Sequence, residues 1–222
     1  MNINNNLSAN MPKLINKVVK VLITGDFFLN LGWGLLSPVF AIFILRNITM
    51  QNPLKAAEVA GFAALFYWIP KSFLQIPIGY FLDKKRGEKD DFWFMLSGYF
   101  VIAFVPLGYL ISSAPWHIYL LQILYAFGIS MALPSWMAIF TRHIDNGKEA
   151  LEWSMESASV GIGAGIAGGL GGIIASALGF NVLFVAVSVL NFISAIILTI
   201  IKNSISARGD GGVILPKPSV GP

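Results

Sequence analysis

Residues 182–201 read VLFVAVSVLNFISAIILTII, an unbroken run without a charged side chain. A membrane-spanning helix needs about 20 mainly apolar residues, because each residue rises ~1.5 Å against a hydrocarbon core of ~30 Å. The run is therefore long enough to cross a bilayer. It lacks the alternation of apolar and polar residues that the wall strand of a membrane barrel requires. We therefore expect a helix here.

The rest of the chain repeats this pattern. Of its 222 residues 56% are hydrophobic and 12% are charged, whereas a soluble domain has about 25% charged residues. The apolar excess predicts an all-α membrane protein with six transmembrane helices, and short connections make consecutive helices antiparallel neighbours. The other five segments are residues 18–45, 59–82, 92–111, 118–140 and 151–178. We expect a polar N-terminal segment (1–17), a six-helix domain (18–203) and a flexible tail (204–222).

The placement of lysine and arginine predicts the orientation. Twelve of these residues fall in the N-terminal segment, the second-to-third and fourth-to-fifth connections and the tail; two fall in the first connection. Cytoplasmic loops are enriched in lysine and arginine. The asymmetry predicts a multi-pass protein of the inner cell membrane with both termini in the cytoplasm. The net charge of +4 is thus interpreted as a topology signal, and we expect no nucleic acid partner.

Ionisable side chains inside a span cost at least about 2.5–3.5 kcal/mol near the bilayer centre. Asp26 is one of them, and Asn30, Trp33 and Ser37 follow it at spacings of four, three and four. On a helix these four positions fall within an arc of about 60°. One interpretation is a polar stripe that lines a wet cavity; the other is an interfacial Asp26 that reaches the headgroups.

The second helix carries Lys71, Gln75, Gly79 and Asp83 at intervals of four. With Asp83 at the inner surface, Lys71 lies ~18 Å deeper, near the middle of the membrane. It is either part of a buried ion pair or a cation that faces a cavity or substrate. On the fourth helix, Gln122 and Tyr125 share a face and are further candidates for lining a binding site.

The fifth helix has two different faces. Its glycines permit close approach of another helix; they are Gly161, Gly165, Gly168 and Gly172. On roughly the opposite face lie Glu149, Glu152 and Glu156. We expect the first two glutamates to form salt bridges near the headgroups with Arg142 and Lys148. Glu156 lies deeper, and either pairs with Lys71 or carries a proton.

The composition argues against an enzyme. The chain has no cysteine and only two histidines, His117 and His143, both at the ends of spans. It also lacks the Gly-Lys-Ser/Thr motif that cradles phosphates. We therefore predict no catalytic residues, no metal and no cofactor.

The connection after the second helix resembles a known motif. Residues 79–89 read GYFLDKKRGEK, and the corresponding loop of the major facilitator superfamily of transporters reads Gly-x-x-x-Asp-Arg/Lys-x-Gly-Arg/Lys. Gly79, Asp83 and Lys84 match, Arg86 adds to the basic turn, and Gly87 follows one residue late. The glycine-rich fifth helix and residues 179–184 are also similar to that family. The resemblance covers about residues 15 to 203.

The resemblance implies a mechanism. Members of this family have twelve helices in two six-helix halves, and substrate binds at the midplane between the halves, which rock to expose it alternately to each side. It therefore implies a secondary active transporter of a small polar or charged solute. With one half per chain, we expect a parallel homodimer, with Asp26 or Glu156 as candidate proton carriers. The alternatives are half of a split transporter, a truncated gene product or a non-transporting membrane scaffold.

Overall fold

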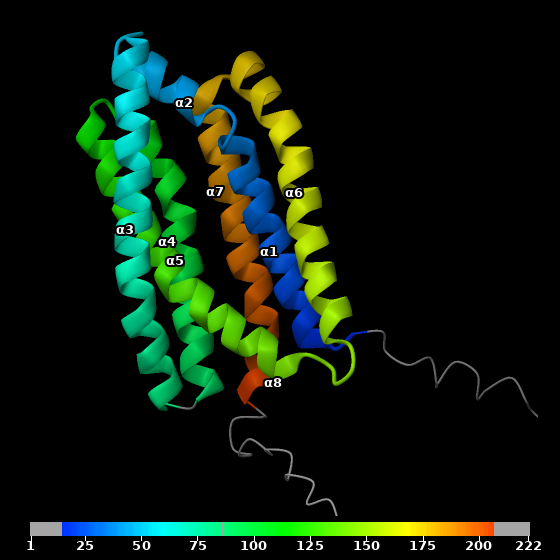
Figure 1. Cartoon of the computed structure of the whole chain (residues 1–222). Coiled ribbons are helices and arrows are strands. Elements are labelled where there is room, and N and C mark those ends of the chain that lie inside the picture. The colour runs from blue at the N-terminus through cyan, green and yellow to red at the C-terminus, as the bar shows by residue number, and fades with distance from the viewer. Residues whose placement is uncertain (1–14, 86, 207–222) are drawn as a thin grey trace, which may run out of the picture.

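The computed structural model describes residues 15–85 and 87–206, and within these ranges it consists of helices without strands (Figure 1). Six helices have the length and composition to cross a membrane. They are α1 (Lys17–Leu36), α3 (Pro53–Lys85), α4 (Glu88–Leu110), α5 (Pro115–His143), α6 (Glu149–Ala177) and α7 (Gly179–Leu198). The predicted fold class is confirmed. Most of the predicted N-terminal segment and tail lie outside the described residues.

The first span differs from its prediction because it is not one helix over residues 18–45. Helix α1 ends at Leu36, and the chain continues as the short helix α2 (Phe40–Phe43) and the π-helical turn η1 (Ile44–Ile48). Pro38 explains the break, because proline lacks the backbone N–H and its ring clashes with the preceding turn. At the other end of the chain, α7 continues through the 3-10 turn η2 (Thr199–Ile201) into α8 (Lys202–Ser206).

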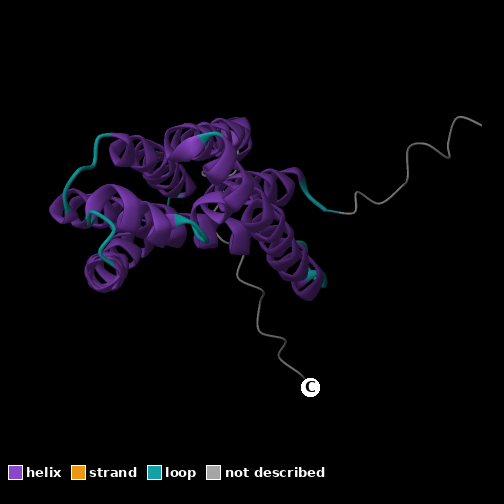
Figure 2. Cartoon of the chain, turned by 90° about the horizontal axis from the view of Figure 1, so that it is seen from above, coloured by secondary structure: helices purple, strands orange, loops and turns teal. Residues whose placement is uncertain are grey.

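The helices pack as two groups of three. Helix α1 packs against α6 and α7, while α5 packs against α3 and α4, and contacts between α4 and α7 join the groups. The view along the bundle shows the helices of both groups connected by short loops (Figure 2). The described ends of the chain, α1 and α8, lie at the same end of the bundle (Figure 1), as an even number of spans requires.

Small residues allow α1 and α6 to approach closely. A Cβ atom at Gly171 of α6 would overlap the carbonyl oxygen of Leu35, and one at Gly34 of α1 would lie 2.8 Å from the Ala167 Cβ. Gly163 faces Phe27 in the same interface. Close backbone contact at small residues is a common source of affinity between helices in lipid, where no hydrophobic effect drives association.

The four glycines that were predicted to pack lie on a different face. No atom lies within 4 Å of a Cβ built at these positions, which are Gly161, Gly165, Gly168 and Gly172. The predicted close packing is therefore not made within the described chain, and it remains a prediction for a second chain. Helices α3 and α6 are the least buried of the six spans, so both leave long apolar faces uncovered.

Polar side chains of α7 tie it to its neighbours. The hydroxyl of Ser188 donates to the carbonyl oxygen of Ala103 at 2.7 Å, and the hydroxyl of Ser194 donates to that of Gly25 at 2.6 Å. Asn191, fully buried, lies beside Gly32 of α1. These bonds hold α7 against both α1 and α4.

The α1–α6 contact gives a first prediction. Gly171→Ala should lower the stability of the folded protein by about 1–3 kcal/mol, because the added methyl group forces the α1 backbone away. Gly169→Ala is the matched control, since nothing lies within 4 Å of a Cβ there, and alanine is the better helix former. Thermal unfolding of both variants in detergent measures the difference. Equal stability of the two variants would contradict the packing described here.

Candidate functional site

Three helices bring polar groups to Asp26, near the middle of α1. The hydroxyl of Tyr99 in α4 donates to Asp26 Oδ1 at 3.0 Å. Asn30 Nδ2 donates to Asp26 Oδ2 at 3.1 Å and to the Asp26 carbonyl oxygen at 2.8 Å. The carboxyl group of Glu156 in α6 is an electrostatic neighbour of Asp26. The predicted residues Asp26, Asn30 and Glu156 therefore form one cluster. We call Asp26 and Glu156 the acid pair, and Asn30 and Tyr99 its donors.

The acid pair has a definite chemical capacity. A hydrogen bond between two carboxyl groups requires one proton between them, because ionised carboxylates only accept. Glu156 is 7% exposed, and its Oε2 has no hydrogen-bond partner among the described residues. Two ionised carboxylates in neighbouring buried positions would repel each other strongly.

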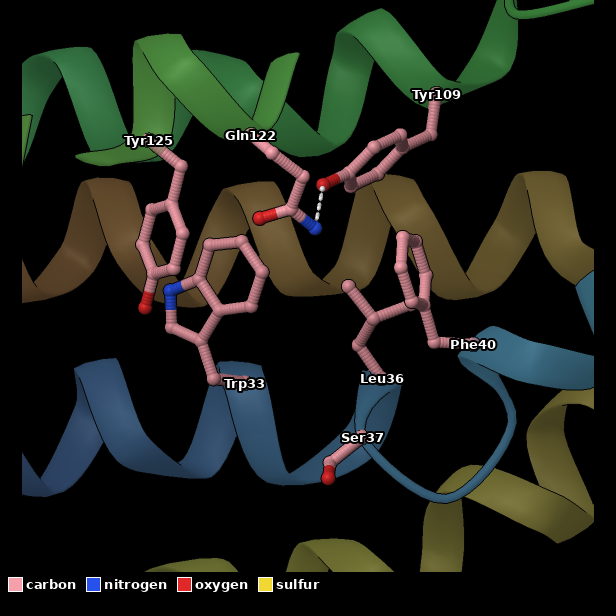
Figure 3. Close-up of a pocket in the computed structure, with 7 residues that line it drawn as sticks. All are labelled: Trp33, Leu36, Ser37, Phe40, Tyr109, Gln122 and Tyr125. Carbon is pink, nitrogen blue, oxygen red and sulfur yellow. Dashed lines mark hydrogen bonds between the residues drawn. The ribbon is translucent and has the colours of Figure 1, made fainter. Parts of the chain in front are cut away.

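A cavity of about 290 Å³ lies farther along α1 (Figure 3). Within it, the Trp33 and Tyr125 rings stack with their centroids 4.1 Å apart, and Gln122 Nε2 donates to the Tyr109 hydroxyl at 3.4 Å. The cavity brings together three of the predicted pathway residues from α1 and α5. Its lining residues are Trp33, Leu36, Ser37, Phe40, Tyr109, Gln122 and Tyr125. Tyr109 and Phe40 were not singled out from the sequence, because aromatic residues in membrane helices are abundant.

Lys71 does not reach the acid pair within this chain. Its Nζ lies 4.5 Å from the centroid of the Trp68 ring and 5.7 Å from that of Tyr67, so it makes cation–π contacts on its own helix. Tyr67 stacks in turn on Tyr125, at 4.9 Å. Lys71 is thus separated from the cavity by one aromatic ring.

Gln75 lines a second pocket of about 490 Å³ between α3 and α5, which Gly79 and Asp83 also line. These residues are therefore not part of the Trp33 cavity. In the basic turn, Lys84 Nζ lies 5.2 Å from the Tyr80 ring centroid. Gly87 precedes α4 as its N-cap, and Arg86 lies outside the described residues.

The sequence did not reveal an ion pair at the basic end of the bundle. Asp91, 1% exposed at the start of α4, accepts a hydrogen bond from Arg142 Nη1 at the end of α5. Arg142 thus pairs with Asp91. The expected salt bridge of Arg142 with Glu149 or Glu152 is not formed. The signal was present, since Asp91 directly precedes one predicted span and Arg142 closely follows another.

The two glutamates near this end bind backbone groups. Glu152 Oε2 accepts from the backbone N–H of Asp145 at 3.3 Å, and Glu149 Oε1 accepts from that of Gly147 at 3.1 Å. Glu152 is fully buried. Nearby, His143 Nδ1 lies 3.7 Å from Glu88 Oε1. These contacts fix the turn between α5 and α6.

Comparison with protein families decides the classification. The family model for the Major Facilitator Superfamily matches residues 22–213, which include five of the six spans and most of the first. The chain belongs to the major facilitator superfamily. A comparison with curated proteins finds no match. Six spans fit a half-size member of this superfamily, and membership indicates a multi-pass membrane transporter.

The buried ion pair of this superfamily member gives a second prediction. Arg142→Gln should destabilise the protein by about 2 kcal/mol, because it leaves the Asp91 carboxylate buried without its charged partner. Adding Asp91→Asn to this variant should restore most of the loss. Arg46→Gln, an exposed position near the opposite end, should change stability little. Unfolding by denaturant in mixed micelles measures the stability of these three variants. A double variant that is less stable than Arg142→Gln would contradict the pairing.

Proposed function

We propose that this chain is a secondary active transporter that moves a small polar or charged solute by alternating access, with the acid pair of Asp26 and Glu156 carrying a coupling proton. The observation that supports the proposal most strongly is the position of the acid pair beside the aromatic cavity. Both sites use α1, since Asp26 belongs to one and Trp33 to the other. Seven residues separate them, which is ~10 Å along the helix.

This arrangement suits coupling because a single helix contributes to both sites. A tilt of α1 that opens the cavity also changes its contact with α6, where Glu156 lies. Protonation of the acid pair and binding of the solute then both shift the position of α1. If protonation changes the affinity for the solute, solute binding changes the affinity for the proton by the same factor. A proton gradient can in this way drive the solute.

We further propose that two copies assemble as a parallel homodimer with both termini in the cytoplasm of the cell, in the inner membrane. Members of the superfamily work with two six-helix halves, and helices α3 and α6 leave apolar faces uncovered. The open glycine face of α6, at Gly161, Gly165, Gly168 and Gly172, is suited to close contact with a second copy. The pairing of Lys71 with Glu156 of that copy also remains a prediction.

Proton coupling gives the third prediction. In liposomes that contain the purified protein and a pH-sensitive dye, at least one solute from a panel of amino acids, sugars and nucleosides should move protons inward. Asp26→Asn and Glu156→Gln should each reduce this proton movement at least tenfold, because neither variant retains two carboxyl groups that share a proton. Glu58→Gln, at an exposed position of α3, is the matched control.

Two outcomes would contradict the proposal in different ways. Undiminished proton movement in both acid variants would exclude the acid pair as the coupling site. A panel in which no solute moves, with or without protons, would favour a non-transporting scaffold.

The homodimer gives the fourth prediction. Light scattering of the detergent-solubilised protein, corrected for bound detergent, should give twice the chain mass of 24.1 kDa. Gly165→Leu should shift the protein toward the single-chain mass, because the side chain holds the α6 faces apart. Ile166→Phe is its control, because Ile166 is an exposed residue of the same helix that lies about 100° around it from Gly165. A single-chain mass for the unsubstituted protein would favour half of a split transporter, which needs a different partner chain.

A further inference from the structure

The cavity in Figure 3 has two walls of aromatic rings that are held in place from behind. One wall is a stack of three rings: Tyr67 lies on Tyr125 at 4.9 Å with an angle of 17°, and Tyr125 lies on Trp33 at 4.1 Å with an angle of 29°. Stacked rings of this kind stabilise one another in offset geometry. The wall therefore exists before any solute binds, which lowers the entropic cost of binding.

The other wall is equally fixed. Phe40 and Tyr109 lie with ring centroids 5.3 Å apart, and both belong to a cluster with Phe43. Phe184 of α7 packs on Tyr109 at 5.4 Å from behind. Tyr109 is 1% exposed, so its ring has little freedom to move. The cavity is therefore lined by aromatic rings on both sides, parallel to within 29° in the Trp33–Tyr125 stack and tilted by 57° between Phe40 and Tyr109.

An amide stands between the two walls. Figure 3 shows the Gln122 side chain between Trp33 and Tyr109, with its nitrogen turned toward the Tyr109 hydroxyl and its oxygen turned away. No hydrogen bond to this oxygen is made by the described residues. The cavity thus offers the Gln122 oxygen as an acceptor, which matches a solute group that donates a hydrogen bond, such as an amide N–H.

Charge is absent from the lining. None of the seven lining residues is charged. Lys71 is not among them and lies over the rings of Trp68 and Tyr67, and Asp26 is ~10 Å from Trp33 along α1. An ionised solute would lose its hydration without gaining an opposite charge, and that loss is costly in an apolar site. The size is also restrictive, because about 290 Å³ holds roughly ten water-sized groups.

We propose that this cavity selects small, flat, uncharged aromatic solutes that carry one amide-like group. The proposal rests on the proposed function in one respect, since it takes the cavity as the solute site of the transporter. It narrows the solute class from polar or charged to polar and uncharged. The two ring walls recognise the flat ring, and the Gln122 amide recognises the polar substituent.

The test is equilibrium dialysis of radiolabelled benzamide against the full chain in detergent, which requires no transport. Benzamide should bind and be displaced by excess unlabelled benzamide. Cyclohexanecarboxamide, of similar size but not flat, and benzoate, flat but negatively charged, should each compete at least tenfold less well. No binding of benzamide, or equal competition by all three compounds, would overturn the proposal without any variant being made.

Two variants locate the site. Tyr125→Leu should weaken benzamide binding about tenfold, because it removes the central ring of the stack. Tyr119→Leu is its matched control: Tyr119 is on the same helix and stacks on Phe66 of α3 at 4.9 Å, but it does not line the cavity. Equal weakening by both variants would place the binding elsewhere and overturn the proposal.

A transport measurement separates this proposal from the proposed function. Benzamide binding without any proton-coupled uptake of any solute would contradict the transporter and leave the site intact. Uptake of a charged solute that benzamide does not inhibit would support the transporter and overturn the solute class.

Discussion

A polar group in the hydrocarbon core has no water to bond, so its partners must come from the protein, and this constraint decides several contacts between helices in this chain. The hydroxyl groups of Ser188 and Ser194 bond to carbonyl groups of α4 and α1. Asp26 meets the same requirement with Tyr99 and Asn30. Each bond joins two helices or two turns of one helix, so the need for hydrogen bonds fixes where the helices cross.

Helix α1 satisfies this constraint and a steric one at once. Its backbone approaches Gly171 of α6 so closely that no side chain fits between them. Nearer the start of α1, the contact of Gly163 with Phe27 holds the segment around Asp26 against α6, the helix that carries Glu156. Beyond Leu36, the break at Pro38 turns the chain away and lets Phe40 of α2 face Tyr109. The cavity therefore owes one of its walls to the interruption of α1.

The sequence was sufficient for the fold and for part of the site. Span length and hydropathy depend on composition alone, which is why the six helices could be predicted, and helical spacing correctly grouped Asp26 with Asn30. Spacing on one helix does not say which other helix lies opposite. The pairing of Glu156 with Asp26, of Arg142 with Asp91, and the choice of Gly171 over the glycines of the open face depend on how the helices are rotated, which only the packed structure supplies.

The packing pattern suggests why the acids and the rings lie apart. The group α1, α6 and α7 and the group α5, α3 and α4 have a similar pattern of internal contacts. One half of a transporter of this superfamily contains two inverted repeats of three consecutive helices, which correspond to α1, α3, α4 and α5, α6, α7, so each group combines helices of both repeats. In this correspondence α1 matches α5 and α6 matches α3. The first group carries the acid pair, whereas the second carries Tyr67, Lys71 and Tyr125. Equivalent helices thus carry acidic side chains in one group and aromatic and basic side chains in the other. The cavity lies where the two groups meet. Relative motion of the two groups therefore changes the shape of the ring-lined cavity. The acid pair lies within the first group, so the distance between its two carboxyl groups changes only when α1 and α6 separate. In the proposed mechanism, coupling then depends on movement inside that group, where the α1–α6 contact of Gly163 with Phe27 lies next to Asp26.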